Sequence, residues 1–329
     1  MMKILFYGFR HGHANAFYKR VKNSGDAEVF ACVEEDEKAR KAAEASLGAV
    51  FSDKSYEELL CSDADVVAVG KAFGDRGKAV IAALRAGKHV IADKPLCTSL
   101  EELSEIRKLS RENNLAVSCL LDLRYLPQTL RAKELLDSKR LGEVKIISVN
   151  GQHCIDYAHR PAWYFEKGMH GGTINDLAIH GIDLVRYLTG LEFSLVTAAR
   201  VWNAYAVKNE DFKDSAVFMA ELENGAEVIA DVSYSAPSQV FSMPTYWEFR
   251  FWCEKGLLTF NYVNGRVTLF EEGSPKPKRL AGRASKADPL TDLYTEIKTG
   301  KRDFTESVLR STETALRIQQ IADGRPVSL

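Results

Sequence analysis

The N-terminal part of the chain alternates short apolar runs with segments in which apolar residues recur every three or four positions. The first pattern is typical of buried strands and the second of amphipathic helices. Gly87 has the position of a helix C-terminal cap, and Ser99 that of an N-cap. We expect strands at residues 4–7, 28–33, 65–69, 89–92 and 116–120, and helices at 14–23, 36–45, 55–60, 75–86 and 99–113. This alternation predicts an α/β fold that begins with a Rossmann-type, doubly wound parallel sheet.

The pattern changes after Pro127. A helix at 128–139 and a strand at 144–150 precede an irregular segment and a helix that Gly190 ends. Residues 193–271 then show strand patterns with the hairpin signals Asn224-Gly225 and Asn264-Gly265, which predict an open, mainly antiparallel sheet. We expect a solvated loop at 273–288 and helices at 288–299 and 305–322. The prediction is a Rossmann domain at 1–122 and a second α/β domain, for substrate binding and oligomerisation, at 123–329.

Composition and charge exclude several classes of function. The 329 residues include 44 basic and 45 acidic side chains, a net charge of −1, which argues against binding to nucleic acid or to anionic membranes. No apolar run approaches the roughly 20 residues that span a bilayer. The six cysteines form no C-x-x-C pair, and the first residues lack a signal-peptide layout. We therefore expect a cytoplasmic protein.

A turn between the first strand and the first helix is a candidate dinucleotide site. It reads GFRHGHA at residues 8–14, where glycines would let the backbone approach a pyrophosphate at the helix N-terminus. Gly8 fits the first glycine of the usual pattern, but Arg10 and His13 occupy the second and third positions, and Gly12 comes one place early. Arg10 could contact phosphate or obstruct it. Taken alone, the turn could equally be one with incidental glycines.

The end of the second strand strengthens the dinucleotide interpretation. Glu34 stands where an acidic residue can bond the adenosine ribose hydroxyls. Glu35 and Asp36 follow, and three carboxylates would repel the 2′-phosphate of NADP, with no arginine expected nearby. We therefore expect NAD rather than NADP, although Asp36 also suits the start of the next helix.

Two further groups suggest proton transfer. Asp176 and His180 are four positions apart on a helix, so a carboxylate there can orient an imidazole and tune it as a base. Lys94 follows an apolar strand and precedes Pro95, where an ammonium could stabilise an alkoxide. Taken alone, the Asp-x-x-x-His pair is more often a surface or capping pair, and Lys94 is more often a solvated loop lysine. Together they favour catalysis.

The irregular segment before Asp176 is rich in histidines, aromatic residues and arginine. Its histidines show no zinc-ligand spacing, so we expect no metal. Aromatic faces and polar side chains suit a polyhydroxylated ligand, although some of these aromatic residues could belong to the core. The candidate substrate-binding residues are His153, Arg160 and Trp163, with Arg124, Asp176 and His180.

These motifs together resemble the Gfo/Idh/MocA family, the group of glucose–fructose oxidoreductase and inositol dehydrogenase, over nearly the whole chain. The segment ALRAGKHV at 83–90 leading into DKPL at 93–96 is similar to the family's A-L-x-A-G-K-H-V…E-K-P-L. RYLP at 124–127 and LGEV at 141–144 resemble its interdomain segment, and GGTINDLAIHGIDL at 171–184 resembles its G-G-G-x-x-x-D-x-G-x-H-x-x-D signature.

The resemblance implies an NAD(P)-dependent dehydrogenase that acts on CH–OH groups of a small-molecule sugar, inositol or related polyol. It implies that His180 is the general base, that Asp176 is its partner and that Lys94 polarises the reacting oxygen. It also implies a homodimer or homotetramer assembled through the open sheet. Cofactor contacts are expected from Gly8, Arg10, His11, Gly12, His13, Glu34, Arg76, Asp93 and Lys94.

Three features depart from the family pattern, and all lie in the cofactor domain. The glycine turn is altered, Asp93 replaces the usual glutamate, and Arg76 stands where a histidine is common. An alternative is therefore a non-catalytic protein of the same fold that senses a dinucleotide or a sugar. A third possibility is a reductase that acts on a non-carbohydrate carbonyl.

Overall fold

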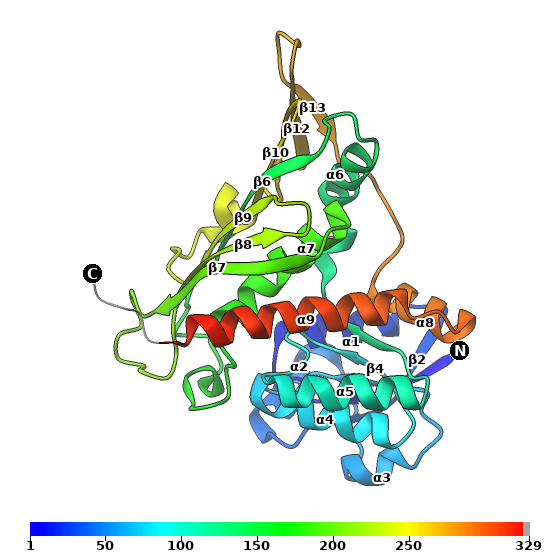
Figure 1. Cartoon of the computed structure of the whole chain (residues 1–329). Helices are drawn as coiled ribbons and strands as arrows, with labels where there is room; N and C mark the ends of the chain where they lie inside the picture. Colours follow the sequence, from blue (N-terminus) through cyan, green and yellow to red (C-terminus); the bar gives the residue numbers. More distant parts are fainter. Residues whose placement is uncertain (325–329) are drawn as a thin grey trace. The chain divides into compact units, whose positions relative to one another are not determined.

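The structure is a computed structural model that describes residues 1–324. Its internal contacts divide the chain into two compact units. The first unit comprises Met1–Leu120, Gly168–Gly171 and Pro289–Thr312, and the second comprises Leu121–Lys167, Gly172–Asp288 and the chain from Glu313. Figure 1 shows the elements of both.

The first unit is built on a five-stranded parallel sheet in the order β2-β1-β3-β4-β5, which confirms the doubly wound prediction. Its strands are β1 (Met2–Tyr7), β2 (Ala27–Val33), β3 (Val66–Val69), β4 (His89–Ala92) and β5 (Val117–Cys119). The helices between them are α1 (Gly12–Lys22), α2 (Glu37–Leu47), α3 (Tyr56–Leu60), α4 (Phe73–Arg85) and α5 (Leu100–Glu112). Ser99 caps α5 as predicted, because its side chain accepts the N–H of Glu102 at 3.1 Å.

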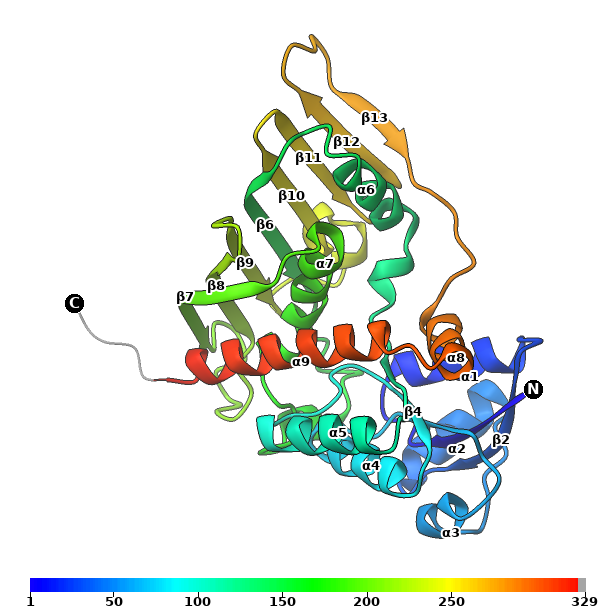
Figure 2. The ribbon, with the colours of Figure 1, turned by 45° about the vertical axis from the view of Figure 1, so that its right-hand side comes forward.

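The second unit contains an eight-stranded sheet in the order β13-β12-β11-β10-β6-β9-β8-β7. Only the β6–β9 pair is parallel, so the prediction of a mainly antiparallel sheet is confirmed. Its strands are β6 (Val144–Gln152), β7 (Phe193–Trp202), β8 (Ser215–Leu222), β9 (Glu227–Ser233), β10 (Glu248–Cys253), β11 (Gly256–Asn261), β12 (Arg266–Glu271) and β13 (Lys278–Ala281). Helices α6 (Pro127–Asp137) and α7 (Ile179–Thr189) cover one face of this sheet (Figure 2).

Short helical turns complete the second unit. Up to residue 324, four are 3₁₀ turns, at Asp122–Tyr125, Ala162–Phe165, Val240–Ser242 and Pro244–Tyr246, and one is a π-helical turn at Ile174–Ala178. Among residues 1–324, no helix combines the length and apolar character that crossing a membrane requires.

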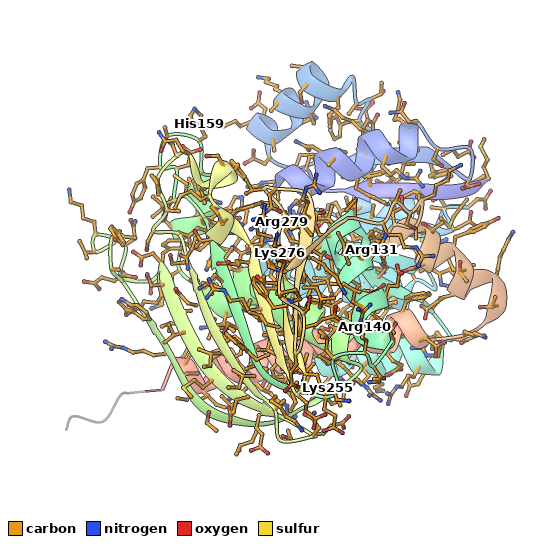
Figure 3. All side chains as sticks on the ribbon, turned by 90° about the horizontal axis from the view of Figure 1, so that it is seen from above. Arg131, Arg140, His159, Lys255, Lys276 and Arg279 are labelled. Atoms are coloured by element: carbon orange, nitrogen blue, oxygen red, sulfur yellow. The ribbon has the colours of Figure 1, made fainter. Side chains whose placement is uncertain are left out.

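The predicted loop at 273–288 is wrong in its centre, because Lys278–Ala281 forms the edge strand β13. Lys276 and Arg279, labelled in Figure 3, belong to this hairpin. Two of the cations that suggested a solvated loop, Lys278 and Arg279, stand on this edge strand, where charged residues discourage pairing with other chains. Glu271 on β12 accepts a hydrogen bond from Lys278 at 2.6 Å.

The predicted second domain at 123–329 is not continuous in the structure. Residues 289–312, which carry α8 (Pro289–Thr299) and the first half of α9 (Asp303–Ala322), group with the first unit. Leu290 and Leu293 of α8 pack into the core of the first unit, and Thr305 accepts the backbone N–H of Val117 at 2.9 Å. Sequence periodicity predicted both helices but carried no information on which core they join.

Candidate functional site

The predicted dinucleotide turn lies at the carboxyl ends of β1 and β3. Gly8 has a φ of 90°, and a Cβ there would lie 2.6 Å from the backbone nitrogen of Lys71. A Cβ on Gly70 would lie 2.3 Å from the carbonyl oxygen of Gly8, so only a pair of glycines permits this approach. Helix α1 begins at Gly12, where an added Cβ would meet no atom within 4 Å. The turn therefore has a close-packed base and open space at its helix N-terminus.

The acidic end of β2 is folded back on this turn. The fully buried carboxylate of Glu34 accepts the N–H of Phe9 at 2.6 Å and that of Asp36 at 2.9 Å. Asp36 caps α2 as predicted. The expectation that no arginine lies nearby is wrong: the guanidinium of Arg10 is 3.7 Å from Glu34 and 3.3 Å from Asp36. Arg10 turns toward these carboxylates because they carry the nearest negative charges, and spacing along the chain could not reveal this.

Sequence reasoning missed a second polar group at the same sheet edge, formed by Tyr7, Glu35 and Lys71. Glu35 accepts a hydrogen bond from the hydroxyl of Tyr7 at 2.7 Å and one from Lys71 at 2.5 Å. The bond from Lys71, followed by that from Tyr7, lowers the pKa of Glu35. Lys71 is distant from Glu35 in sequence, and only the parallel pairing of β1 with both β2 and β3 brings them together.

The three features that depart from the expected pattern meet in one cluster, in which Asp93 and Arg76 are buried and His11 and His13 are partly exposed. Asp93, at the end of β4, is 1% exposed, and its two carboxylate oxygens lie 2.9 Å from Nδ1 of His11 and 3.0 Å from Nδ1 of His13. The guanidinium of Arg76 lies 3.6 Å from the same carboxylate and donates to the carbonyl oxygens of Lys71 and Pro95. We refer to His11, His13, Asp93 and Arg76 as the Asp93 cluster.

The Asp93 cluster bears on the expectation that there is no metal. Ligand atoms of His11, His13 and Asp93 lie within 4.8 Å of one another, a spacing that could hold a cation. The cationic side chains of Arg76 and Lys94, however, already outnumber the single carboxylate of Asp93. A divalent cation would add to this excess of positive charge, so the electrostatics favour an anion.

Lys94 belongs to the first unit and is 4% exposed. It follows β4, its backbone N–H donates to Asp93 at 2.7 Å, and its ammonium lies 5.7 Å from the ring centre of Phe73. His170, which was not predicted as a site residue, lies 5.9 Å from the same ring. The lysine is therefore a buried cation, not the solvated loop lysine that its sequence context also allowed.

Asp176 and His180 belong to the second unit and are 1% and 6% exposed. The prediction of one continuous α-helix is wrong, because Asp176 lies on the π-helical turn and His180 in the first turn of α7. Such π-helical turns often occur at functional sites, because the wider turn re-aims side chains. The carboxylate of Asp176 accepts a hydrogen bond from the hydroxyl of Tyr234, which follows β9.

Aromatic rings connect the two histidines of this unit. The ring of His180 packs edge-on to Trp247 with centroids 5.4 Å apart, and His153 packs against the same indole at 5.4 Å. His153 also contacts Tyr246 at 5.1 Å and lies 6.4 Å from Tyr234. The structure thus brings the predicted residues His153, Asp176 and His180 into one aromatic cluster. Tyr234, Tyr246 and Trp247 gave no signal in the sequence.

The other predicted substrate residues are placed differently. Arg160 stacks on Tyr234 with its guanidinium carbon 5.1 Å from the ring centre, and it donates to the carbonyl oxygens of Cys154 and Ile155. Trp163 is buried, 4.2 Å from the ring of Tyr164. His159, labelled in Figure 3, has an 82% exposed side chain and pairs with Asp156.

Arg124 lies in a buried bidentate ion pair with the carboxylate of Asp183 on α7. A pair of this kind fixes α7 to the segment that precedes α6, and removing one partner would leave an uncompensated buried charge.

Two protein-family models match the chain in succession. The model of an oxidoreductase family with an NAD-binding Rossmann fold, GFO_IDH_MocA, matches residues 2–120. The model of the GFO/IDH/MocA C-terminal domain matches residues 129–259. The chain belongs to the GFO/IDH/MocA family.

Curated members of the GFO/IDH/MocA family align with parts of the chain. The chain is 35% identical to levoglucosan dehydrogenase of Pseudarthrobacter phenanthrenivorans over 123 residues, which cover 36% of this chain and 31% of that protein. It is 29% identical to inositol 2-dehydrogenase 2 of Saccharopolyspora erythraea over 204 residues, 62% of this chain and 57% of that protein. The aligned part is thus less than two thirds of either relative.

Solved structures of similar fold cover the whole chain. Aldose-aldose oxidoreductase from Caulobacter crescentus, complexed with glycerol, superimposes with a TM-score of 0.82 at 18% identity over 100% of this chain and 99% of that one. This similarity supports the fold assignment.

In this member of the GFO/IDH/MocA family, the turn at residues 8–14 has features that fit a bound dinucleotide. Open space lies at the N-terminus of α1, where backbone N–H groups lack intrahelical acceptors. Within the described residues, the fully buried Nε of Arg76 has no hydrogen-bond partner. An anionic group at this turn would suit both features.

Proposed function

We propose that the protein is an NAD-dependent oxidoreductase that interconverts a secondary alcohol and a ketone on a sugar, inositol or related polyol. The observation that carries the proposal is the buried hydrogen bond from Tyr234 to Asp176, four positions before buried His180, in a chain whose residues 2–120 match an NAD-binding Rossmann model. The names of the levoglucosan and inositol dehydrogenases support the substrate class.

The proposed chemistry assigns one task to each of three residues. His180 accepts the hydroxyl proton of the alcohol, which raises the electron density available for hydride departure. Asp176, held by the hydroxyl of Tyr234, orients the imidazole of His180 and stabilises its protonated form. Lys94 polarises the reacting oxygen as its negative charge develops.

Bound NAD would supply the hydride acceptor. The backbone of Gly8 and Gly12, with the side chains of the Asp93 cluster, would face its diphosphate, and Glu34 would bond the adenosine ribose. Arg10 lies beside both Glu34 and Asp36 and partly neutralises both carboxylates, so the proposed preference for NAD rests on the bond from Glu34 to the ribose hydroxyls.

The substrate side of the proposal rests on the aromatic cluster of the second unit. Half-buried Tyr246 beside His153 offers a flat apolar face of the kind that covers the C–H surfaces of sugars, and His153 adds polar atoms. Trp247 is buried and supports both His153 and His180 from behind. Arg160 and Trp163 would shape the wall of this site. Arg124 would act indirectly, by holding α7 through Asp183.

The experiment is a turnover screen of the purified protein with NAD and a panel of inositols, aldoses and anhydrosugars, following NADH formation. We expect turnover of at least one polyol, abolished by His180→Ala. Turnover of apolar secondary alcohols in preference to sugars would show that the proposed substrate class is wrong. Cofactor binding without turnover of any alcohol or ketone would favour the alternative of a sensor.

We also propose that two copies associate through the open face of the second unit's sheet. Across β12, β11, β10 and β6, the register places Phe270, Leu257, Trp252 and Ile146 in one row. Trp252 is 47% exposed and Ile146 44%, whereas Phe251 and Ile147 on the opposite face are fully buried. An exposed apolar row of this length suits a self-complementary interface.

The protein is proposed to act in the cytoplasm. Cys32, Cys61, Cys154 and Cys253 carry free thiols, which is typical of a reducing compartment.

A further inference from the structure

The Asp93 cluster joins three separate departures from the family pattern. His11 and His13 come from the altered glycine turn, Asp93 replaces a glutamate, and Arg76 replaces a histidine. In the structure all of them converge on the Asp93 carboxylate at 2.9, 3.0 and 3.6 Å. The simplest explanation for changes at distant positions that meet at one carboxylate is that the changed residues share one function.

Hydrogen-bond chemistry fixes where the protons lie in this cluster. Burial raises the pKa of Asp93, but the nearby charges of His11, His13 and Arg76 outweigh this and lower it well below its ordinary value. The group is therefore a carboxylate, which can only accept hydrogen bonds. It follows that both imidazoles donate through Nδ1–H to Asp93.

The surroundings of His11, chiefly its burial, decide the state of this imidazole without a ligand. Burial lowers the pKa of His11 to about 4, with Asp93 opposing this change and His13 and Lys94 adding to it. His11 is thus neutral near neutral pH. Among the other elements packed against this group, Arg76 of α4 lies 3.6 Å from Asp93. The ring of Phe73, also of α4, lies 5.7 Å from that of His11 and 5.9 Å from that of His170.

We infer that the His11–Asp93–His13 group binds the cofactor diphosphate through a protonated imidazole. The protein therefore takes up a proton when the dinucleotide binds. The inference rests on the proposed function. Helix α1 begins between the two histidines, and a diphosphate at its N-terminus would bring two negative charges beside them.

Negative charge stabilises an imidazolium, and with Nδ1–H donated to Asp93 only the protonated ring has an N–H at Nε2. Asp93 is in this account a positioning residue. It holds both rings by their inner nitrogens, and its carboxylate also stabilises the imidazolium that forms. A glycine turn of the usual kind would bind the same diphosphate through backbone N–H groups alone, without proton uptake.

The sign of the pH dependence follows from this linkage. A proton taken up on binding makes the apparent affinity for NADH fall as pH rises, by at most about tenfold per pH unit, between the histidine pKa values of the free and bound protein. Above the bound-state value the affinity becomes independent of pH.

The test uses the full chain and NADH as the probe. Calorimetric titrations in buffers of different ionisation enthalpy give the number of protons taken up, and the dissociation constant is measured between about pH 5 and about pH 8. We expect uptake of up to about one proton per NADH in the wild-type protein. In a His11→Gln/His13→Gln double variant we expect the uptake and the pH dependence to be lost. His159→Gln, an exposed histidine of the second unit, should keep both.

Binding of NADH without proton uptake, at an affinity constant over this range, would overturn the inference and leave the proposed function standing. Proton uptake and affinity are measured here on the wild-type protein, so this outcome does not depend on whether any variant folds. Tight Zn²⁺ binding that is lost in the double variant would also overturn the inference, because the cluster would then be a cation site. Failure to bind NADH at any pH would overturn the proposed function itself.

Discussion

Tyr234 and Asp176 are joined by a buried hydrogen bond in which the phenol donates to the carboxylate. Asp176 lies on a π-helical turn and Tyr234 follows β9, so the bond ties the carboxylate proposed to orient His180 to the sheet. A hydrogen bond to a charged group contributes about 1.5–3 kcal/mol, enough to fix one orientation of the carboxylate.

We expect Tyr234→Phe to lower kcat by roughly tenfold while leaving KM for the cofactor unchanged, because a free carboxylate would no longer orient His180. Steady-state kinetics of the variant on the substrate found in the screen measures this. An unchanged kcat would show that Asp176 is held adequately without the phenol.

His180→Ala should lose at least about 100-fold in kcat, the scale of general-base catalysis, while NADH binding persists. His159→Ala is the matched control, because His159 is an exposed histidine of the same unit. Near-normal turnover of the His180 variant would remove this residue from the mechanism.

Glu34→Ala should weaken NADH binding more than NADPH binding. The change removes the proposed acceptor of the ribose hydroxyls and releases Arg10 toward a 2′-phosphate. Since Glu34 also accepts the N–H of Phe9, Glu34→Gln is the control that retains an acceptor without the charge. Equal weakening of both cofactors, or none, would mean that Glu34 does not contact the ribose.

Stability should fall as the pH decreases from about 6.5 to about 4. His11 has an ordinary pKa of 6.5 and a folded-state pKa of about 4, so in this window the unfolded chain binds a proton that the folded chain excludes. The contribution is fully present above the unfolded pKa and lost below the folded one, and amounts to at most about 3 kcal/mol. Half-buried His89, whose pKa is also lowered by burial, acts in the same direction.

Urea unfolding at several pH values measures this dependence. We expect His11→Gln to flatten the dependence in part, with the lowered pKa of His89 and, toward the acid end of the window, the lowered pKa of Glu35 contributing to the remainder. The lowered pKa of Asp93 adds a further loss of stability only below its ordinary value of 3.8, outside this window. A pH dependence identical to that of the wild-type protein would contradict a neutral His11.

Trp252→Glu should convert the assembled protein to monomers, because it places a charge in the exposed apolar row of the sheet. Sedimentation velocity measures the change. Phe241→Glu is the control, since Phe241 is 69% exposed but lies on a 3₁₀ turn outside the sheet. An unchanged sedimentation coefficient would place the interface elsewhere.

The strands and helices of the first unit were predictable because local patterns determine them. Gly87 adopts a φ of 74° after α4, and Ser99 caps α5, as their positions in the sequence indicate. The strand β13 was not predictable from its composition, because its pairing with β12 is a non-local property.

The candidate site was predictable only where a motif repeated the family pattern. Lys94, Asp176 and His180 stand in such motifs, and the structure shows all three to be buried. Tyr234 and Trp247 stand in none, and tertiary packing alone brings them to Asp176 and His180. The Asp93 cluster was likewise only partly predictable. The sequence shows that each of its residues differs from the family pattern, but it does not show that they come together in the fold.

The most direct test of the account is a titration of the purified protein with NADH and, separately, NADPH, following energy transfer from its four tryptophans to the nicotinamide. We expect saturable binding of both at about micromolar concentrations or weaker, with NADH bound more tightly. No binding of either cofactor would contradict the central claim that this chain is a nicotinamide-dependent oxidoreductase.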